Sequence, residues 1–245
     1  MDLKEMDFDP RGHWYYETKF NLLFKILKDF TFDQKLIIDI GAGSGFFCHK
    51  FLDKYKFNKG ICFDVNYNEA LEINPKIEFT KIIPKDKGDL ILLIDVLEHV
   101  ENEGEVLQIL PLHPSSLILV TVPAFNFLWS SHDDFLDHKR RYTKKSLKSV
   151  LVKNNFEILS IGYIFTFLFF PVLLVRSLKK FLKLDKNDRS DMKKAKRILN
   201  WSLIKILKFE FLTCPSKLLG LSVVAVARQI SPTPKEHTSN QRVVL

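Results

Sequence analysis

A short apolar run that ends in a cluster of glycines constrains the fold of this chain most. Residues 36–40 read Leu-Ile-Ile-Asp-Ile, and Gly41, Gly43 and Gly45 follow at once. The run predicts a buried strand, and the glycines let the backbone turn sharply with no Cβ in the way. Helical spacing returns over residues 46–55. We therefore expect a strand, a tight loop and a helix in succession.

Predicted strands and helices alternate along the rest of the chain. We expect strands at residues 36–40, 60–64, 77–79, 89–94, 116–122, 156–163 and 221–227, and helices at 14–30, 46–55, 67–73, from about 95 to 110, and at 143–154. This alternation predicts an α/β fold with a doubly wound, mostly parallel sheet. The length of 245 residues fits a single domain, which we place at residues 1–229, with a flexible tail at 230–245.

A carboxylate at the end of the second predicted strand suggests a nucleoside ligand. Asp64 stands 19 residues past Gly45, where a carboxylate can accept hydrogen bonds from both ribose hydroxyls of an adenosine. A dinucleotide-binding loop needs Gly-x-Gly-x-x-Gly, but Phe46 or His49 takes the third glycine's place in the two possible registers. This disfavours a nicotinamide-dependent oxidoreductase, which is one alternative function. The other alternative is a catalytically silent membrane adaptor.

Three segments resemble class I S-adenosylmethionine-dependent methyltransferases. Residues 39–45 match the family's Asp-x-Gly-x-Gly-x-Gly loop, residues 89–100 are similar to the fourth-strand motif of a subgroup that includes quinone-biosynthesis enzymes, and residues 13–16 resemble an N-terminal His-Trp-Trp segment. The resemblance covers about residues 11–228. It implies a Rossmann-like, seven-stranded sheet with an antiparallel last strand, and a helical insertion at about 165–213 that shapes the acceptor site.

The resemblance also implies the cofactor, S-adenosylmethionine, and the residues that bind it. Lys19 stands where relatives often carry Arg, and would meet the methionine carboxylate without a bidentate fork. The triplet Leu97-Glu98-His99 would begin the next helix, with His99 packed against the sheet rather than catalytic. The predicted cofactor-binding residues are Lys19, Asp39, Gly41, Ala42, Gly43, Asp64, Val65, Ile94 and Asp95.

The loop after the fifth predicted strand carries the candidate catalytic residues. Relatives share a His-Asp-x-x-x-x-His-x-Arg-Arg-Tyr pattern, which this chain matches from His132 to Tyr142 with one extra residue. If the acceptor is a hydroxyl, a general base helps. His132 with Asp133 is the first candidate and His138 the second. Trp129, Arg141 and Tyr142 are predicted to bind the acceptor. Alternatively, the loop is structural and an Asp133–Arg141 ion pair holds it.

Charge is divided unevenly along the chain. Residues 1–137 hold 14 basic and 23 acidic residues, whereas residues 138–245 hold 23 basic and 6 acidic ones. Residues 158–175 carry no charge, but a strand at their start and Pro171 leave too little to cross a bilayer. We expect residues 164–208 either to lie on an anionic membrane surface or to form the wall of an acceptor pocket.

The remaining expectations concern the partner and the compartment. The acceptor is predicted to be a small or lipid-linked molecule with an O or N nucleophile. Nucleic acid is not expected, because the chain has no appended RNA-binding module. Three distant cysteines and the mixed charge of the first residues indicate a cytoplasmic protein, peripheral on the membrane if it binds one. No grouping of residues has a metal-ligand spacing, so no metal is predicted.

Overall fold

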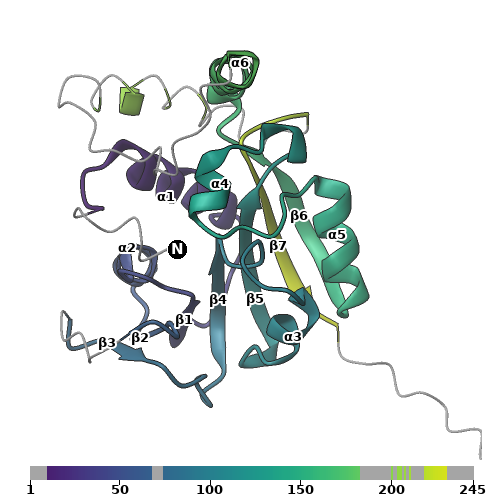
Figure 1. The fold of residues 1–245 in the computed structure, drawn as a ribbon. Coiled ribbons are helices and arrows are strands. Elements are labelled where there is room, and N and C mark those ends of the chain that lie inside the picture. Colours follow the sequence, from purple (N-terminus) through teal and green to yellow (C-terminus); the bar gives the residue numbers. More distant parts are fainter. Residues whose placement is uncertain are drawn as a thin grey trace, which may run out of the picture.

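Seven strands form one sheet in the order β3-β2-β1-β4-β5-β7-β6 (Figure 1). The computed structural model describes residues 10–67, 74–182, 200, 203–205, 207, 210 and 218–230. The strands are β1 (Leu36–Ile40), β2 (Lys59–Phe63), β3 (Ile77–Thr80), β4 (Gly88–Ile94), β5 (Leu112–Pro123), β6 (Phe156–Ile164) and β7 (Ser222–Gln229). Strand β7 runs antiparallel to both of its neighbours, β5 and β6, and the other pairs are parallel. The predicted mostly parallel sheet with an antiparallel last strand is confirmed.

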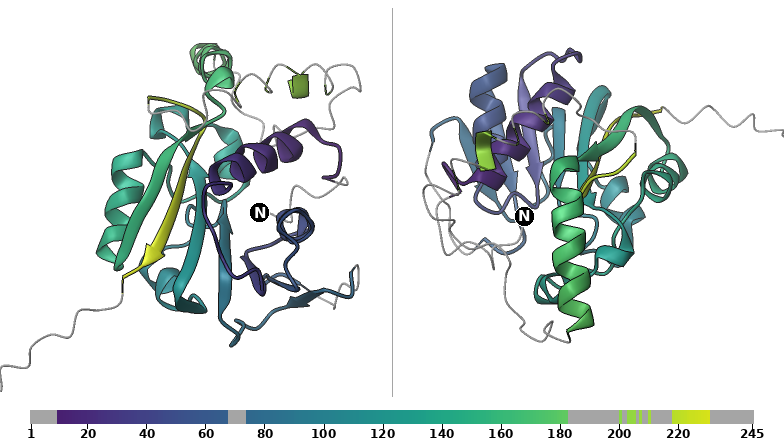
Figure 2. Two further views of the ribbon diagram at one scale, coloured as in Figure 1. Left: turned by 180° about the vertical axis from the view of Figure 1, so that it is seen from behind. Right: turned by 90° about the horizontal axis from the view of Figure 1, so that it is seen from above.

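Helices cover both faces of the sheet, as a doubly wound fold requires (Figure 2). They are α1 (Trp14–Leu27), α2 (Phe46–Tyr55), α3 (Glu103–Gln108), α4 (Ser131–Phe135), α5 (Lys144–Lys153) and α6 (Thr166–Phe181), with a short 3-10 helix, η2 (Asn126–Leu128). Helices α1 and α2 pack on one face in a core that includes Leu23 and Phe51. Helices α3 and α5 pack on the other, around Leu107 and Leu147.

The segment after β4 differs from its prediction. The expected helix from about residue 95, with the Leu97-Glu98-His99 triplet at its start, is wrong. Helix α3 begins only at Glu103, because the side chain of Asn102 caps it by accepting a hydrogen bond from the backbone N–H of Gly104. Asp95 has a φ of 55°, which turns the chain as β4 ends. Residues 95–102 therefore form a turning loop at the carboxyl edge of the sheet.

Two other predicted helix boundaries can be compared with the structure. Thr143 caps α5 by accepting a hydrogen bond from the backbone N–H of Ser146, which confirms the predicted cap. Helix α1 ends at Leu27 rather than at residue 30. The helix predicted at 67–73 lies almost wholly outside the described residues.

Helix α6 starts the predicted insertion and runs directly on from β6. The carboxylate of the buried Glu210 accepts a hydrogen bond from the backbone N–H of Thr166 at 2.7 Å, so a distant part of the chain caps the helix. Pro171 lies inside α6, and the expectation that it interrupts the apolar run is wrong. Among the described residues, no helix is long and apolar enough to cross a membrane. Most of residues 183–213, and the tail from 231 on, lie outside the described residues.

Candidate active site

The glycine loop after β1 has a left-handed backbone conformation that residues with a side chain rarely adopt. Gly41, Gly43 and Gly45 all have positive φ, between 54° and 70°. A Cβ on Gly41 would lie 2.8 Å from a methyl group of Val96. The backbone N–H of Gly41 donates to the carbonyl of Phe63 at 2.8 Å, which ties the loop to the end of β2. The loop therefore stays open and close to the strand ends, where a ligand can approach the backbone.

Asp64 joins the loop to the turn after β2. One carboxylate oxygen accepts a hydrogen bond from the backbone N–H of Gly43, and the other from the N–H of Asn66, both at 3.0 Å. The hydroxyl of Tyr67 donates to the carbonyl of Gly43 at 2.6 Å. Each carboxylate oxygen can accept a second hydrogen bond. Asp64 can thus hold the loop and still accept from the two hydroxyls of a ribose.

A cavity of about 580 Å³ opens beside this loop. Of the predicted cofactor-binding residues, Gly41, Asp64, Val65 and Asp95 line it, together with His99. Four others do not line it: Asp39, Ala42, Gly43 and Ile94. Asp39 is buried behind the loop, and this burial raises the pKa of its carboxyl to about 7. The volume and the polar edge suit a nucleoside.

Lys19 is fully buried on α1, and its ammonium forms an ion pair with Asp95. It also donates to the hydroxyl of Tyr15 at 3.2 Å, while the hydroxyl of Thr121 donates to Asp95 at 2.9 Å. Burial opposes the ionisation of Asp95, but the charge and hydrogen bond of Lys19 outweigh it and lower the pKa of that carboxyl. If Lys19 contacts a methionine carboxylate as predicted, its ammonium would interact with that carboxylate and with Asp95 at the same time.

A second cavity, of about 460 Å³, lies on the other side of Asp95. Its wall combines aromatic residues of α1, the loop after β4, the loop around α4 and the inner face of α6. Three residues line both cavities: Asp95, His99 and Leu136. The two cavities therefore share a boundary at these three residues.

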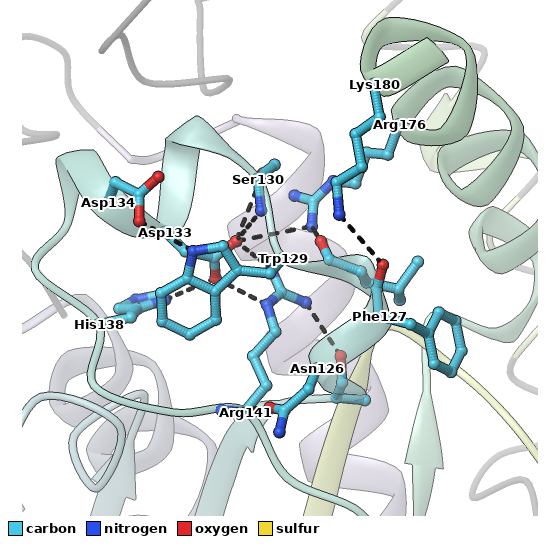
Figure 3. Close-up of polar contacts among 12 residues, drawn as sticks. Asn126, Phe127, Trp129, Ser130, Asp133, Asp134, His138, Arg141, Arg176 and Lys180 are labelled. Atoms are coloured by element: carbon cyan, nitrogen blue, oxygen red, sulfur yellow. Dashed lines mark hydrogen bonds and ion pairs between the residues drawn. The ribbon is translucent and has the colours of Figure 1, made fainter. Parts of the chain in front are cut away.

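Asp133 orients His138 (Figure 3). The Nδ1 of His138 lies 2.9 Å from one Asp133 oxygen, and Arg141 donates to both oxygens at 2.7 and 3.0 Å. Burial opposes ionisation of Asp133, but the hydrogen bonds from His138 and Arg141 hold its pKa well below the usual range. His132 with Asp133 is the first candidate from the sequence and His138 the second, and the structure gives His138 a direct contact with Asp133. The predicted Asp133–Arg141 ion pair is present.

Only some of the residues predicted to act on or bind the acceptor line the second cavity. His132, His138 and Arg141 line the second cavity. The indole N–H of Trp129 instead donates to Asp134 at 2.8 Å, and the buried Tyr142 hydroxyl donates to the carbonyl of Leu97 at 3.0 Å. Neither Trp129 nor Tyr142 is among the residues that line the cavity, so the structure gives their predicted contact with the acceptor no support.

Sequence reasoning missed two residues of the loop after β4. Glu98 and His99 line the second cavity, and the ring of His99 lies 4.7 Å from that of His138. Glu98 is fully buried with no hydrogen-bond partner for either carboxylate oxygen, and burial raises its pKa well above the usual range. The Leu-Glu-His motif was visible in the sequence, but the prediction placed it at the start of a helix and so did not indicate that Glu98 and His99 line a cavity.

Glu98, His99 and His138 also form a candidate metal-binding group that the sequence spacing did not predict. Their ligand atoms lie within 4.8 Å of one another, and nitrogen and carboxylate ligands suit a divalent transition metal. The raised pKa of Glu98 favours its neutral form, which is a weak metal ligand. Without a metal ion, a neutral Glu98 can donate a hydrogen bond in the second cavity.

Comparison with known proteins identifies the family. The family model described as a methyltransferase domain matches residues 13–161, which is more than half of the chain. The chain belongs to the methyltransferase-domain family. This confirms the resemblance to class I S-adenosylmethionine-dependent methyltransferases, and the seven-stranded sheet agrees with their fold. No curated protein matches the methyltransferase in sequence.

Solved structures share the fold of this methyltransferase at low sequence identity. Phosphoethanolamine N-methyltransferase 2 of Haemonchus contortus, solved with S-adenosyl-L-methionine, is 14% identical with a TM-score of 0.54, over 87% of this chain and 52% of that one. The plantazolicin methyltransferase BpumL, solved with a monoazolic desmethylPZN analog and SAH, is also 14% identical with a TM-score of 0.53, over 89% of this chain and 85% of that one. These likenesses extend the family match to most of the chain as a shared fold.

Proposed function

We propose that this methyltransferase transfers a methyl group from S-adenosylmethionine to a hydroxyl oxygen of a small or lipid-linked acceptor. The observation that carries the proposal is that Asp95 and His99 line both cavities. The cavity beside Asp64 suits the cofactor, and the cavity beside His138 suits the acceptor. The cofactor supplies an activated methyl, so the protein has to position the acceptor and remove its proton.

The cofactor cavity provides contacts for each part of the cofactor. Asp64 would accept hydrogen bonds from the ribose hydroxyls, as its remaining lone pairs allow. Lys19 lies beyond Asp95, where its ammonium can be shared between Asp95 and the methionine carboxylate. This arrangement would direct the methyl group toward the junction of the cavities.

His138 is the proposed general base. Its Nδ1 is held by Asp133, so the neutral ring presents Nε2 toward the acceptor cavity. Nε2 would take the hydroxyl proton as the acceptor oxygen bonds to the methyl carbon. The carbon–sulfur bond breaks, and its electron pair stays on sulfur. Asp133 is ionised and can stabilise the imidazolium that forms.

The acceptor cavity has a mixed wall, which supports an acceptor with both polar and apolar parts. The polar side includes Glu98, whose neutral carboxyl can donate a hydrogen bond. The opposite side is formed by α6 and includes Leu168 and Val172. An acceptor with a hydroxylated head and an apolar extension fits this division.

Labelled cofactor tests the proposal and finds the acceptor in one experiment. The purified protein is incubated with metabolite or lipid extract and S-adenosylmethionine that carries a deuterated methyl group, and labelled products are sought by mass spectrometry. We expect a labelled methyl ether that is absent when His138→Ala replaces the wild type. Labelled N-methyl products alone would overturn the choice of oxygen, and failure to bind S-adenosylhomocysteine in calorimetry would overturn the cofactor assignment.

A further inference from the structure

Helix α6 exposes an uncharged face along its whole length. Phe170 and Phe181 are 64% and 83% exposed, and Leu174 is 69% exposed. With a rise of about 1.5 Å per residue, the face extends over roughly 20 Å. We call it the outer face of α6, and its exposed large apolar residues are Phe167, Phe170, Leu174, Val175, Leu178 and Phe181.

The cations of α6 point away from this face, toward the body of the protein. Arg176 has a side chain only 14% exposed, donates to the carbonyl of Leu128 and lines the acceptor cavity. Lys179 lines the same cavity, and Lys180 reaches the carbonyl of Phe127 at 3.5 Å (Figure 3). A helix on the surface of a water-soluble domain normally has the opposite arrangement, with its apolar stripe inward. Helix α6 instead directs its cations toward the protein, beside the apolar Leu168, Phe169 and Val172, and leaves only uncharged residues on its outer face.

The outer face is continuous with the mouth of the acceptor cavity. Pro171 and Val175 are exposed and also line the cavity. Exposed apolar surface of this extent marks a binding surface for another molecule or a membrane. An occupant of this face would touch both the helix and any acceptor that enters the cavity beside it.

The charge of the chain indicates which occupant fits. Residues 183–197, which follow α6, contain seven basic and three acidic residues. An apolar helix face next to a basic segment in the sequence is the composition of a segment that lies in the interface of an anionic membrane. A second copy of the chain would carry the same basic segment, and repulsion between like charges disfavours a dimer.

We propose that the outer face of α6 lies in the headgroup boundary of an anionic lipid bilayer, where the acceptor cavity opens onto the membrane and takes a lipid-linked acceptor. The choice of a lipid-linked acceptor rests on the proposed methyl transfer. Contact with the membrane rests only on the helix and its neighbouring charges.

Vesicle flotation with matched variants tests this surface. We expect the full-length protein to float with phosphatidylcholine vesicles that contain phosphatidylglycerol, to bind pure phosphatidylcholine weakly, and to lose binding as salt rises. The double variant Phe170→Gln, Phe181→Gln should bind the anionic vesicles at least about tenfold more weakly. The control, Ile82→Gln with Val152→Gln, changes two exposed apolar residues away from α6 and should float like the wild type.

Three results would overturn the membrane proposal. One is a wild type that binds neither kind of vesicle, and another is equal loss of binding in the control. The third is a wild type that sediments as a dimer, ignores vesicles and becomes a monomer when Phe170 and Phe181 are changed, which would assign the face to a second copy. S-adenosylhomocysteine binding measured on the same samples separates this failure from a failure of the proposed function.

Discussion

The cofactor cavity and the acceptor cavity are built in different ways. One wall of the cofactor cavity is built locally, from the left-handed glycine loop and from Asp64, while its other wall comes from the loop after β4, from α3 and from residues 136–139. The acceptor cavity depends on side chains from α1, the loop after β4, the loop around α4, and α6. A site built locally leaves a motif in the sequence, whereas a site assembled from distant elements does not. The difference also predicts that mutations will separate cofactor binding from turnover.

The largest expected effect is on the acceptor side. His138→Ala should lower turnover by about a hundredfold or more, because it removes the proposed base, while affinity for S-adenosylhomocysteine stays unchanged. Initial rates with the identified acceptor and calorimetry with S-adenosylhomocysteine measure the two quantities. His132→Ala is the matched comparison and should lower turnover by less than about tenfold. If the His132 variant loses more activity than the His138 variant, the base is His132.

On the cofactor side, a mutation is expected to lower affinity for the cofactor first. Asp64→Ala should weaken binding of S-adenosylhomocysteine by about 1.5–3 kcal/mol, since the ribose loses a charged acceptor. The loop also loses the hydrogen bond from Gly43. Titration calorimetry checks this, with Asp86→Ala, an exposed carboxylate before β4, as the control. Equal affinity of the Asp64 variant and the wild type would contradict the assigned cofactor site.

Two buried carboxylates should give the two regions opposite responses to pH. Burial raises the pKa of Asp39 to about 7, so its contribution to stability is complete below about pH 4 and is lost as pH rises through about 7. Asp133 has a lowered pKa, and its contribution is lost only as pH falls below the ordinary range of an aspartate.

Asp39→Asn tests the response of the cofactor side. We compare the free energy of unfolding of the variant with that of the wild type at each pH. From about pH 5 to about pH 8 this difference should shift in favour of the variant by on the order of 1–4 kcal/mol, because the wild type must bury a charged carboxylate at the higher pH and the amide carries no charge. Urea denaturation at the two pH values measures the change. The same difference between variant and wild type at both pH values would show that Asp39 does not titrate in this window.

The smallest effect is expected from metal removal. Treatment with EDTA should leave turnover unchanged, because the proposed methyl transfer uses His138 of the Glu98–His99–His138 group as a base and not as a metal ligand. Rates measured before and after chelation provide the check, with magnesium, manganese and zinc added back separately. Loss of activity that one of these ions restores would make the group a metal centre and His138 a ligand rather than a base.

The sequence predicted the parts of the fold in which each segment shows its own pattern. The strand at 36–40, the glycine loop and the cap at Thr143 are all as predicted, because apolar runs, glycines and capping side chains act locally. Helix α6 continues through Pro171 despite the local signal, and a distant residue, Glu210, caps its first turn. Tertiary contacts of this kind leave no pattern in the neighbouring sequence.

The acceptor site was predicted only in part for the same reason. The sequence indicated the loop from 123 to 142 but could not show that Asp133 contacts His138, since this depends on the phase of a five-residue helix. It also gave no sign that Glu98 would be buried without a partner. Only the fold brings the loop after β4 beside α4 and α6.

The central claim is that the two cavities meet so that the methyl group of the cofactor faces the acceptor. A crystal structure of the protein with S-adenosylhomocysteine tests it most directly. The account predicts ribose hydroxyls on Asp64 and the sulfur atom beside Asp95 and His99, with an open path from sulfur to His138. A sulfur atom that points away from this junction, or a ligand bound outside the cavity beside Gly41, would contradict it.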